Sequence, residues 1–173
     1  MTLTGKKVLM VIASREFRDE EYQKPRKILE SEGVAVTVAC SSMNESTGML
    51  GLKVRPDILL KDAKPEQYDA VIFVGGMGAT EYWDDPVAHA LAKSVYGAGK
   101  PTAAICLAPM TLANAGLLQG KKATIWKDAV PDFKTKGVVY TGSPVEQDGR
   151  LITGSGPEAA ESFARALVEA LRK

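Results

Sequence analysis

The sequence predicts an α/β domain with a mostly parallel sheet that is covered by helices on both faces. Two observations carry this prediction. Short runs rich in Val, Ile and Ala alternate along the chain with longer amphipathic stretches. The short runs are apolar at nearly every position, which is typical of strands buried on both faces of a parallel sheet. A chain of 173 residues also suits a single domain, so we expect one domain over 1–173.

The order of the elements follows from apolar runs and from helix start and stop signals. Strands are predicted at 7–13, 34–40, 68–74 and 101–105. Helices are predicted at 20–32, 86–98, 109–115 and 157–171. The helix at 86–98 has Pro86 in its first turn and Asp84 or Asp85 as its cap. Gly116 is placed to end the helix at 109–115.

Two stretches interrupt this alternation. Residues 41–61 contain Gly48, Gly51 and Pro56, which predicts a hairpin or an irregular insertion. Residues 138–153 contain an Asp-Gly pair between two apolar runs, 140–145 and 151–153, which predicts a second hairpin.

Composition and charge exclude several classes of protein. Lys and Arg number 22 against 21 Asp and Glu, and this balance argues against a nucleic-acid partner, which calls for a basic excess. No apolar run approaches the roughly 18 residues of a membrane span, and no signal peptide is predicted. The two cysteines, Cys40 and Cys106, are too far apart to suggest a disulfide framework, so the cytoplasm is the expected compartment. No cluster of side chains has metal-ligand spacing, and neither a metal nor a cofactor is expected.

Cys106 is the strongest candidate for a reactive group. Residues 103–109 pass from a strand to a helix with almost no loop, so the residue at the turn must take a strained backbone conformation that exposes its side chain. Backbone amides at the start of the next helix would lower the pKa of the thiol and favour the thiolate. The alternative is that Cys106 is a small hydrophobic residue buried for packing alone.

Two other loops follow predicted strands and would open on the same edge of the sheet. Gly75 and Gly76 offer backbone amides that could bind an oxyanion, or they form a plain tight turn. Glu20 and Glu21 lie in an acidic first helical turn, where surface carboxylates are common. A buried glutamate that faced the cysteine would instead stay protonated and donate a hydrogen bond to the thiolate.

His89 is the only histidine of the chain. It falls on the predicted helix at 86–98, where a surface or packing role is expected. Nothing in its sequence context brings it to Cys106, so a Cys-His pair is not predicted.

Taken together, these turns resemble those of the ThiJ/PfpI superfamily, the DJ-one and PfpI-like proteins, over nearly the whole chain. The most specific match is 103–109 followed by 112–116, which is similar to the nucleophile elbow A-I-C-x-G-P. Residues 17–21 with Pro25 are similar to the acidic motif of the family, 74–76 to its P-G-G turn with Val in place of Pro, and 151–157 to its closing segment.

The resemblance implies a flavodoxin-like three-layer sandwich of the class I glutamine amidotransferase-like fold, and a homodimer. It makes Glu21 the glutamate that contacts Cys106. The backbone amides of Gly75, Gly76 and Leu107 become the oxyanion donors. The activities of the family include peptidase, glyoxalase and deglycase, chaperone and oxidative-stress sensing.

The chain departs from the family pattern at positions that matter for catalysis. Leu107 stands where many peptidase and deglycase members carry histidine, and Trp126 occupies or adjoins the place of another histidine in the DJ-one group. Trp126 and Ala108, which replaces the elbow glycine, are therefore expected to line the pocket. Arg18 stands where the PfpI motif has its second acidic residue. A hydrolytic cycle needs a group that moves protons, and no histidine is evident for it.

Three functions remain open. The first is a response to oxidative or carbonyl stress through the Cys106 thiolate, with a small carbonyl compound or an oxidant as its ligand. The second is a cysteine-dependent glyoxalase, deglycase or hydrolase in which Cys106 is the nucleophile and Glu21 the acid and base. The third is a non-catalytic dimeric binding protein whose pocket is closed by Leu107 and Trp126. A PfpI-type peptidase is not expected because the Cys-His dyad is absent.

Overall fold

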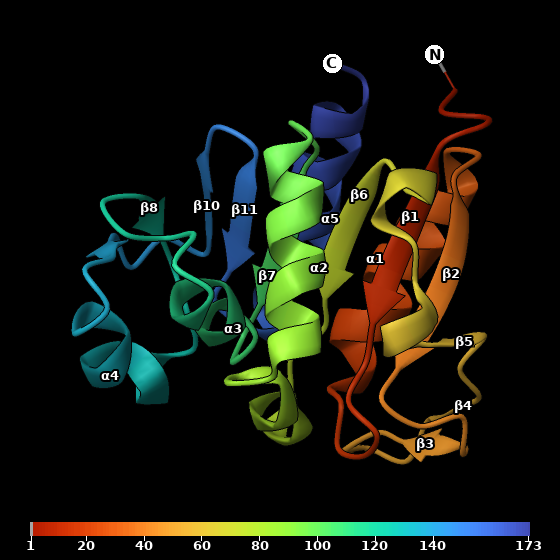
Figure 1. Cartoon of the computed structure of the whole chain (residues 1–173), viewed down its shortest axis with the longest axis horizontal. Coiled ribbons are helices and arrows are strands. Elements are labelled where there is room, and N and C mark those ends of the chain that lie inside the picture. Colours follow the sequence, from red (N-terminus) through yellow and green to blue (C-terminus); the bar gives the residue numbers. More distant parts are fainter. Residues whose placement is uncertain (1) are drawn as a thin grey trace.

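Seven strands form the central sheet of the structure, a computed structural model that describes residues 2–173 (Figure 1). Their order across the sheet is β10-β11-β7-β6-β1-β2-β5. The strands are β1 (Lys7–Val11), β2 (Ala35–Cys40), β5 (Ile58–Leu59), β6 (Ala70–Phe73), β7 (Thr102–Ile105), β10 (Val145–Asp148) and β11 (Leu151–Gly154). Neighbours run parallel except for β10 and β11, which form an antiparallel pair. The predicted mostly parallel sheet is thus confirmed.

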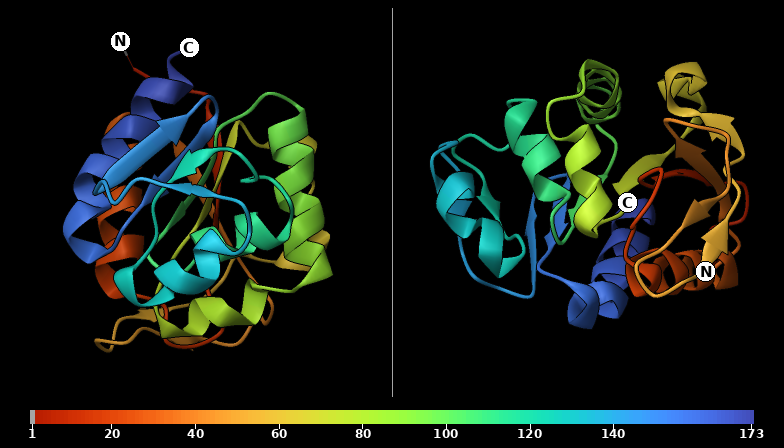
Figure 2. Two further views of the ribbon diagram at one scale, coloured as in Figure 1. Left: turned by 90° about the vertical axis from the view of Figure 1, so that its left-hand side faces the viewer. Right: turned by 90° about the horizontal axis from the view of Figure 1, so that it is seen from below.

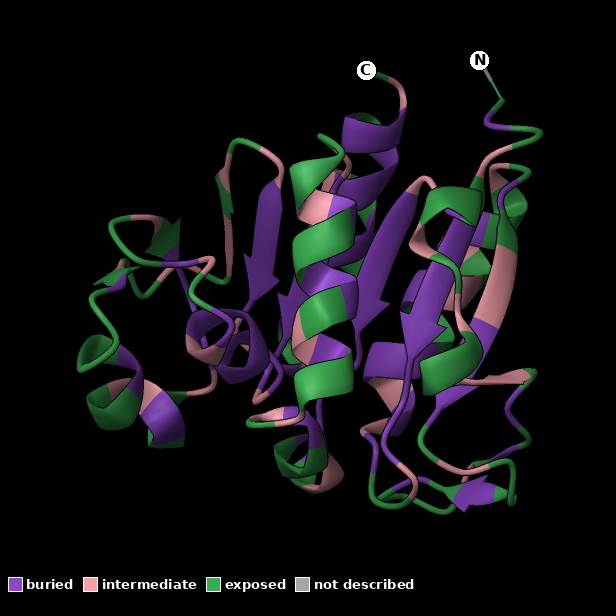
Figure 3. Ribbon diagram, viewed as in Figure 1, coloured by how far each residue is buried: buried purple, intermediate pink, exposed green. Residues whose placement is uncertain are grey.

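Helices cover both faces of this sheet (Figure 2). On one face lie α1 (Asp19–Ser31) and α5 (Ala160–Leu171), and on the other lie α2 (Pro86–Gly97) and α3 (Pro109–Asn114). Strand β1 is apolar at every position after Lys7: Val8 and Met10 pack on the α1 and α5 side, while Leu9 and Val11 pack on the α2 side. Successive side chains of a strand point to opposite faces, so a strand between two helical layers needs apolar residues at every position. Figure 3 shows the central strands buried and the outward face of α2 exposed.

Smaller elements lie at the edges of the sheet. One antiparallel pair is formed by β3 (Ser46–Thr47) and β4 (Lys53–Val54), and a parallel pair by β8 (Lys122–Ala123) and β9 (Val139–Tyr140). The remaining α-helix, α4, spans Val130–Lys134. Short 3₁₀ turns are found at Leu60–Asp62, Pro65–Gln67, Met77–Tyr82, Lys127–Ala129 and Pro157–Ala159.

Most predicted elements are present with ends shifted by a few residues, and two need correction. The first strand of the second hairpin is β10, not 140–145, because the turn lies at Gly149 and Asp148 pairs with Leu151. The insertion at 41–61 does contain a hairpin, but its end adds β5 to the main sheet beside β2. The cap of α2 is Asp85, which accepts hydrogen bonds from the backbone amides of Val87 and Ala88.

The topology places three loops side by side at one edge of the sheet. Strands β7, β6 and β1 are neighbours and parallel, so the segments that follow them leave from the same edge. Those segments carry Cys106, the glycines at 75–78 and the start of α1. Within 2–173, no helix is long and apolar enough to cross a membrane.

Candidate functional site

Cys106 occupies the turn between β7 and α3 in a left-handed backbone conformation. Its φ is 64°, which is uncommon for a residue other than glycine and costs energy that the surroundings must offset. Its backbone is held on both sides: the amide donates to the Gly154 carbonyl at 2.9 Å, and the carbonyl accepts from the Trp126 amide at 2.8 Å. The predicted elbow is therefore present, with the neighbouring strand β11 and the Trp126 loop fixing it.

Glu21 lies beside Cys106 and is fully buried in the first turn of α1. Among residues 2–173, neither of its carboxyl oxygens finds a hydrogen-bond partner of ordinary geometry. The group that interacts with it most is the Cys106 thiol, and the Gly75 amide interacts with it as well. Burial is the main cause that raises the pKa of Glu21 to about 8, although these two groups oppose it. A carboxyl with this pKa exists in both forms near neutral pH.

The glycine loop after β6 owes its composition to close backbone approach. A side chain at Gly75 would place a Cβ 2.5 Å from Cys106 Cβ and would also collide with the Glu21 carboxyl. Gly76 has a φ of 110° and lies against the backbone of Arg18. Only glycine allows the loops after β1, β6 and β7 to approach this closely. The loop thereby brings its amides to the two ionisable groups, that of Gly75 to Glu21 and that of Gly76 to the cysteine.

The pKa of the Cys106 thiol is raised, which is opposite to the direction expected from the sequence. Burial is the largest cause, the Glu21 carboxylate is the second, and together they bring the pKa to about 12. The backbone amides of Gly76 and Leu107 act in the other direction. Helix α3 has only six residues, and its dipole is too weak to outweigh burial. The site at rest therefore holds a thiol next to a carboxyl group that titrates first.

A small cavity of about 220 Å³ opens beside Cys106. We call it the inner cavity. It is lined by Arg18, Met49, Gly76, Met77, Cys106, Leu107, Trp126, Asp128 and Pro157. Ala108, which was expected in the lining, lies instead in the hydrophobic core on the α2 side. Its amide donates to the Ile105 carbonyl, and this turn directs it inward.

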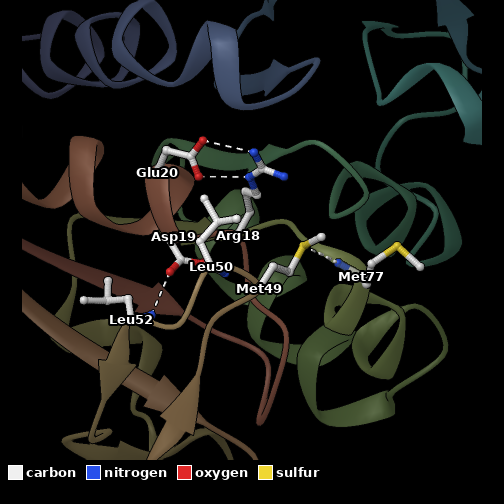
Figure 4. A network of polar contacts seen from close by, with 7 residues as sticks. All are labelled: Arg18, Asp19, Glu20, Met49, Leu50, Leu52 and Met77. Carbon is white, nitrogen blue, oxygen red and sulfur yellow. Dashed lines mark hydrogen bonds and ion pairs between the residues drawn. The ribbon is translucent and has the colours of Figure 1, made fainter.

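Arg18, which lies close to Glu21 in the sequence, lines the inner cavity. Its Nε and Nη2 donate to the two carboxyl oxygens of Glu20 at 2.9 and 3.1 Å, which forms a bidentate pair (Figure 4). The hydrogen bonds from Arg18 are the main cause that lowers the pKa of Glu20. The two adjacent glutamates thus have opposite surroundings, because Glu20 is paired at the surface and Glu21 is buried.

The mouth of the cavity is formed by a loop that sequence reasoning did not assign to the site. The buried carboxylate of Asp19 accepts hydrogen bonds from the amides of Leu50 and Leu52 at 2.9 and 2.8 Å. This contact holds Met49 over the cavity, where its thioether sulfur accepts from the Met77 amide at 3.4 Å (Figure 4). Gly48 and Gly51 were the only signals of this loop in the sequence, and they do not indicate where it packs.

Behind the site, the Leu107 backbone is fixed from the α2 side. The Trp83 indole donates to the Leu107 carbonyl at 2.9 Å, and the Trp83 carbonyl is 2.8 Å from Nε2 of His89. His89 is therefore tied to Trp83 and is not part of the inner cavity lining. Across residues 2–173, no three His, Cys, Asp or Glu side chains gather where they could hold a metal ion.

The arrangement has the parts needed for nucleophilic chemistry. It places a sulfur nucleophile and two amides aimed at the sulfur at one small cavity, and a buried carboxyl group with a pKa near neutral interacts with the sulfur. A carboxyl group with a pKa near the working pH is suited to accept and return a proton.

Several known proteins are similar to this chain in sequence or in structure. A protein of Methanocaldococcus jannaschii with no characterised function is 40% identical over 170 residues, which cover 96% of this chain and 83% of that protein. A deglycase of Pyrococcus horikoshii is 31% identical over 166 residues, 96% of this chain and 99% of the relative. The crystal structure of a ThiJ/PfpI domain protein from Brachyspira murdochii superposes with a TM-score of 0.94 at 30% identity, covering 97% of this chain and 98% of that one. The sequence model of the DJ-1/PfpI family matches residues 6–170, and the chain belongs to this family.

Proposed function

We propose that the protein is a cysteine-dependent enzyme that converts small carbonyl compounds, in the manner of a glyoxalase or deglycase. The observation that carries this proposal is the contact between Cys106 and a buried glutamate with a pKa of about 8, at the end of a small cavity. The deglycase named among the relatives supports the same class of chemistry. In the absence of a nearby histidine, Glu21 takes the role of the group that moves protons.

The proposed reaction begins with addition of the thiol to an aldehyde carbon. Ionised Glu21 accepts the thiol proton as the Cys106 sulfur bonds to carbon, and the electron pair of the C=O double bond moves to oxygen. That oxygen then takes the proton from Glu21, which is ionised again. The amides of Gly76 and Leu107 stabilise the negative charge on that oxygen.

With a 2-oxoaldehyde, the cycle closes without an external oxidant. Glu21 carries one proton from the former aldehyde carbon to the neighbouring carbonyl carbon, and the hydroxyl proton on the first oxygen moves to the second oxygen, which leaves a thioester of a 2-hydroxy acid on Cys106. The first carbon is thereby oxidised and the second reduced. Water then cleaves the thioester, releases the acid and restores the thiol.

Turnover of methylglyoxal by purified variants tests the proposal. We expect Cys106→Ser and Glu21→Gln each to lower kcat/KM by at least about 100-fold, since each removes a group that acts in the bond-making step. For the wild type, kcat/KM should rise with pH and reach half its maximum near the pKa of Glu21, about 8. Cys40→Ala is the matched control, because Cys40 is fully buried elsewhere in the core. Wild-type turnover by Cys106→Ser would contradict the proposal.

A second candidate function is the sensing of oxidants through Cys106. It is favoured by the difference between the two cysteines: Cys106 opens on the inner cavity, whereas Cys40 has no exposed surface and its sulfur lies 3.7 Å from the Tyr82 hydroxyl. Mild peroxide should then add oxygen to Cys106 alone, as seen by mass spectrometry of its peptide. Equal oxidation of both cysteines, or of neither, would exclude this role.

We further infer from family membership that the protein is a cytoplasmic homodimer. Light scattering coupled to size-exclusion chromatography measures the mass directly, and a value near 18.5 kDa would exclude the dimer.

A further inference from the structure

A second, larger cavity of about 580 Å³ adjoins the inner cavity. We call it the outer cavity. It is lined by Arg18, Glu20, Lys24, Trp126, Lys127, Ser155, Gly156, Pro157 and Glu158. We propose that the outer cavity binds a carboxylate on the substrate whose carbonyl group reaches Cys106. This inference rests on the proposed function and adds to it the class of substrate.

The two cavities share part of their walls. Arg18, Trp126 and Pro157 line both of them. A ligand that extends from the sulfur past these three residues enters the outer cavity. The inner cavity, about 220 Å³, has room for a small carbonyl fragment, and the larger volume lies outside it. The shape therefore suits a substrate with a reactive end and a longer second part.

The boundary between the cavities is a fixed aromatic wall. Trp126 packs directly on Gly156, where an added Cβ would lie 2.9 Å from the indole ring. The indole Nε1 donates to Asp128 at 3.2 Å, and the Trp126 amide donates to the Cys106 carbonyl at 2.8 Å. The wall is thus tied to the same backbone that positions the nucleophile, so a group bound against it has a defined distance to the sulfur.

The charges of the outer cavity favour an anion. Arg18 and Glu20 neutralise each other through their bidentate pair, and the remaining guanidinium nitrogen points away from Glu20 (Figure 4). The other charges of the lining are the positive ones of Lys24 and Lys127 and the negative one of Glu158. The Lys127 ammonium is 5.6 Å from the centre of the Trp126 ring and is therefore held at the boundary between the cavities.

The balance of charge also indicates the kind of anion. Three cationic and two anionic side chains line the outer cavity, which leaves one positive charge in excess. This excess matches the single charge of a carboxylate. A phosphate dianion would leave the occupied cavity with one negative charge uncompensated. We therefore expect 2-oxoaldehydes that carry a carboxylate to be better substrates than neutral ones of equal size.

A matched pair of substrates separates charge from size. One is a 2-oxoaldehyde with a chain that ends in a carboxylate, and the other is its carboxamide. We expect wild-type kcat/KM to be several-fold higher for the carboxylate than for the carboxamide. Each of Lys24→Gln and Lys127→Gln should lower kcat/KM for the carboxylate by roughly two- to fivefold, as for exposed ion pairs. The ratio of kcat/KM for the carboxylate to kcat/KM for the carboxamide should therefore fall in both variants.

Lys134→Gln is the matched control, since Lys134 also lies over an aromatic ring, that of Tyr140, at 5.7 Å but is not in either cavity wall. The substrate preference should survive this change. Equal kcat/KM for the carboxylate and the carboxamide in the wild type would overturn the proposal, as would an undiminished preference in the Lys24→Gln, Lys127→Gln double variant.

A binding measurement keeps this inference separate from the proposed function. N-acetylalaninate and N-acetylalaninamide have no reactive carbonyl, and their binding is followed by the NMR shift of the Trp126 indole N–H. A carboxylate preference that disappears in the double variant supports the outer cavity even if no aldehyde is turned over. Equal shifts with both ligands would refute it even if methylglyoxal turnover is confirmed.

Discussion

Glu21 and Cys106 are two ionisable side chains that the fold holds mainly in their neutral forms. Burial raises the pKa of each, and ionisation of one makes ionisation of the other harder. Burial favours the neutral form of both groups, yet catalysis needs one of them to release its proton. The lower pKa of Glu21 makes it the group that does so first. Reactivity of the thiol should therefore follow the titration of the carboxyl.

The raised pKa of Glu21 also makes the stability of the protein depend on pH. A carboxyl with a folded-state pKa above its ordinary value of 4.5 stabilises the fold at low pH, and this contribution is lost as pH rises toward about 8. The free energy of unfolding should fall by up to about 1.4 kcal/mol per pH unit across this range. Glu21→Gln should flatten this slope. Urea denaturation of both proteins at a series of pH values measures it, and parallel slopes would refute the prediction.

Gly75 is required by space, and this can be tested apart from catalysis. A methyl group at this position would overlap with Cys106 Cβ and with the Ile105 carbonyl. We expect Gly75→Ala to destabilise the protein by roughly 2–3 kcal/mol, because neither the elbow nor the strand can move away.

Gly97→Ala is the control for that change. Gly97 ends α2, and nothing lies within 4 Å of its missing side chain. The same substitution there should stabilise the protein by roughly 0.5 kcal/mol, since alanine favours the helix. Thermal denaturation of both variants gives the sign of each effect. A neutral Gly75→Ala would show that the elbow is more adaptable than its contacts indicate.

The sequence predicts which side chains form the site better than it predicts their pKa values. Cys106, Glu21 and Trp126 could be placed near one another because each follows or adjoins a predicted strand end or a family motif. The direction of the thiol pKa could not be predicted, since it depends on how deeply Cys106 is buried and on the shortness of α3. Asp128 could not be assigned to the site either, because only the folded chain brings it to the inner cavity.

At the scale of elements, a single carboxylate holds the loop that carries Met49 in place. Asp19 receives two backbone hydrogen bonds from this loop, at Leu50 and Leu52. Asp19→Ala should cost about 1–3 kcal/mol of stability and raise amide exchange at Leu50 and Leu52 by at least about tenfold, as these two donors lose their partner. Hydrogen exchange followed by NMR measures both amides directly.

Asp85→Ala provides the comparison, because Asp85 also accepts two backbone amides, those of Val87 and Ala88 at the start of α2. It should cost about 1 kcal/mol and leave exchange at Leu50 and Leu52 unchanged. If Asp19→Ala leaves that exchange unchanged as well, other contacts hold the loop, and Met49 covers the cavity for a different reason.

The elements that could be predicted are those with a strong local pattern. Strands β1, β2, β6 and β7 are mostly apolar, and α2 has a proline and a capping aspartate at its start. The strand β10 was misplaced, since it is a polar edge strand with the sequence Val-Glu-Gln-Asp and its register is set by pairing with β11. The two-residue strands β5 and β8 exist only through their partners and have no pattern of their own.

At the scale of the whole molecule, the site is attached to the most protected part of the sheet. Strand β6 lies between β1 and β7, and its four residues are buried by helices on both faces. The loops that carry Glu21, Gly75 and Cys106 leave from these three strands. A strained elbow persists only where the surrounding structure holds it in place, and the centre of the sheet provides that support.

This placement predicts a gradient of hydrogen exchange across the sheet. Amides of β6 should exchange only when the whole chain unfolds, whereas those of β10, a partly exposed edge strand paired on one side only, should exchange at least about 100-fold faster through local opening. Exchange measured under native conditions with small additions of urea distinguishes the two, because global opening becomes faster with urea and local opening does not. Equal rates in β6 and β10 would mean that the sheet opens as one unit. The site would then have no more protection than the edge, and the strain at Cys106 would have to be held by its two backbone hydrogen bonds to Gly154 and Trp126 alone.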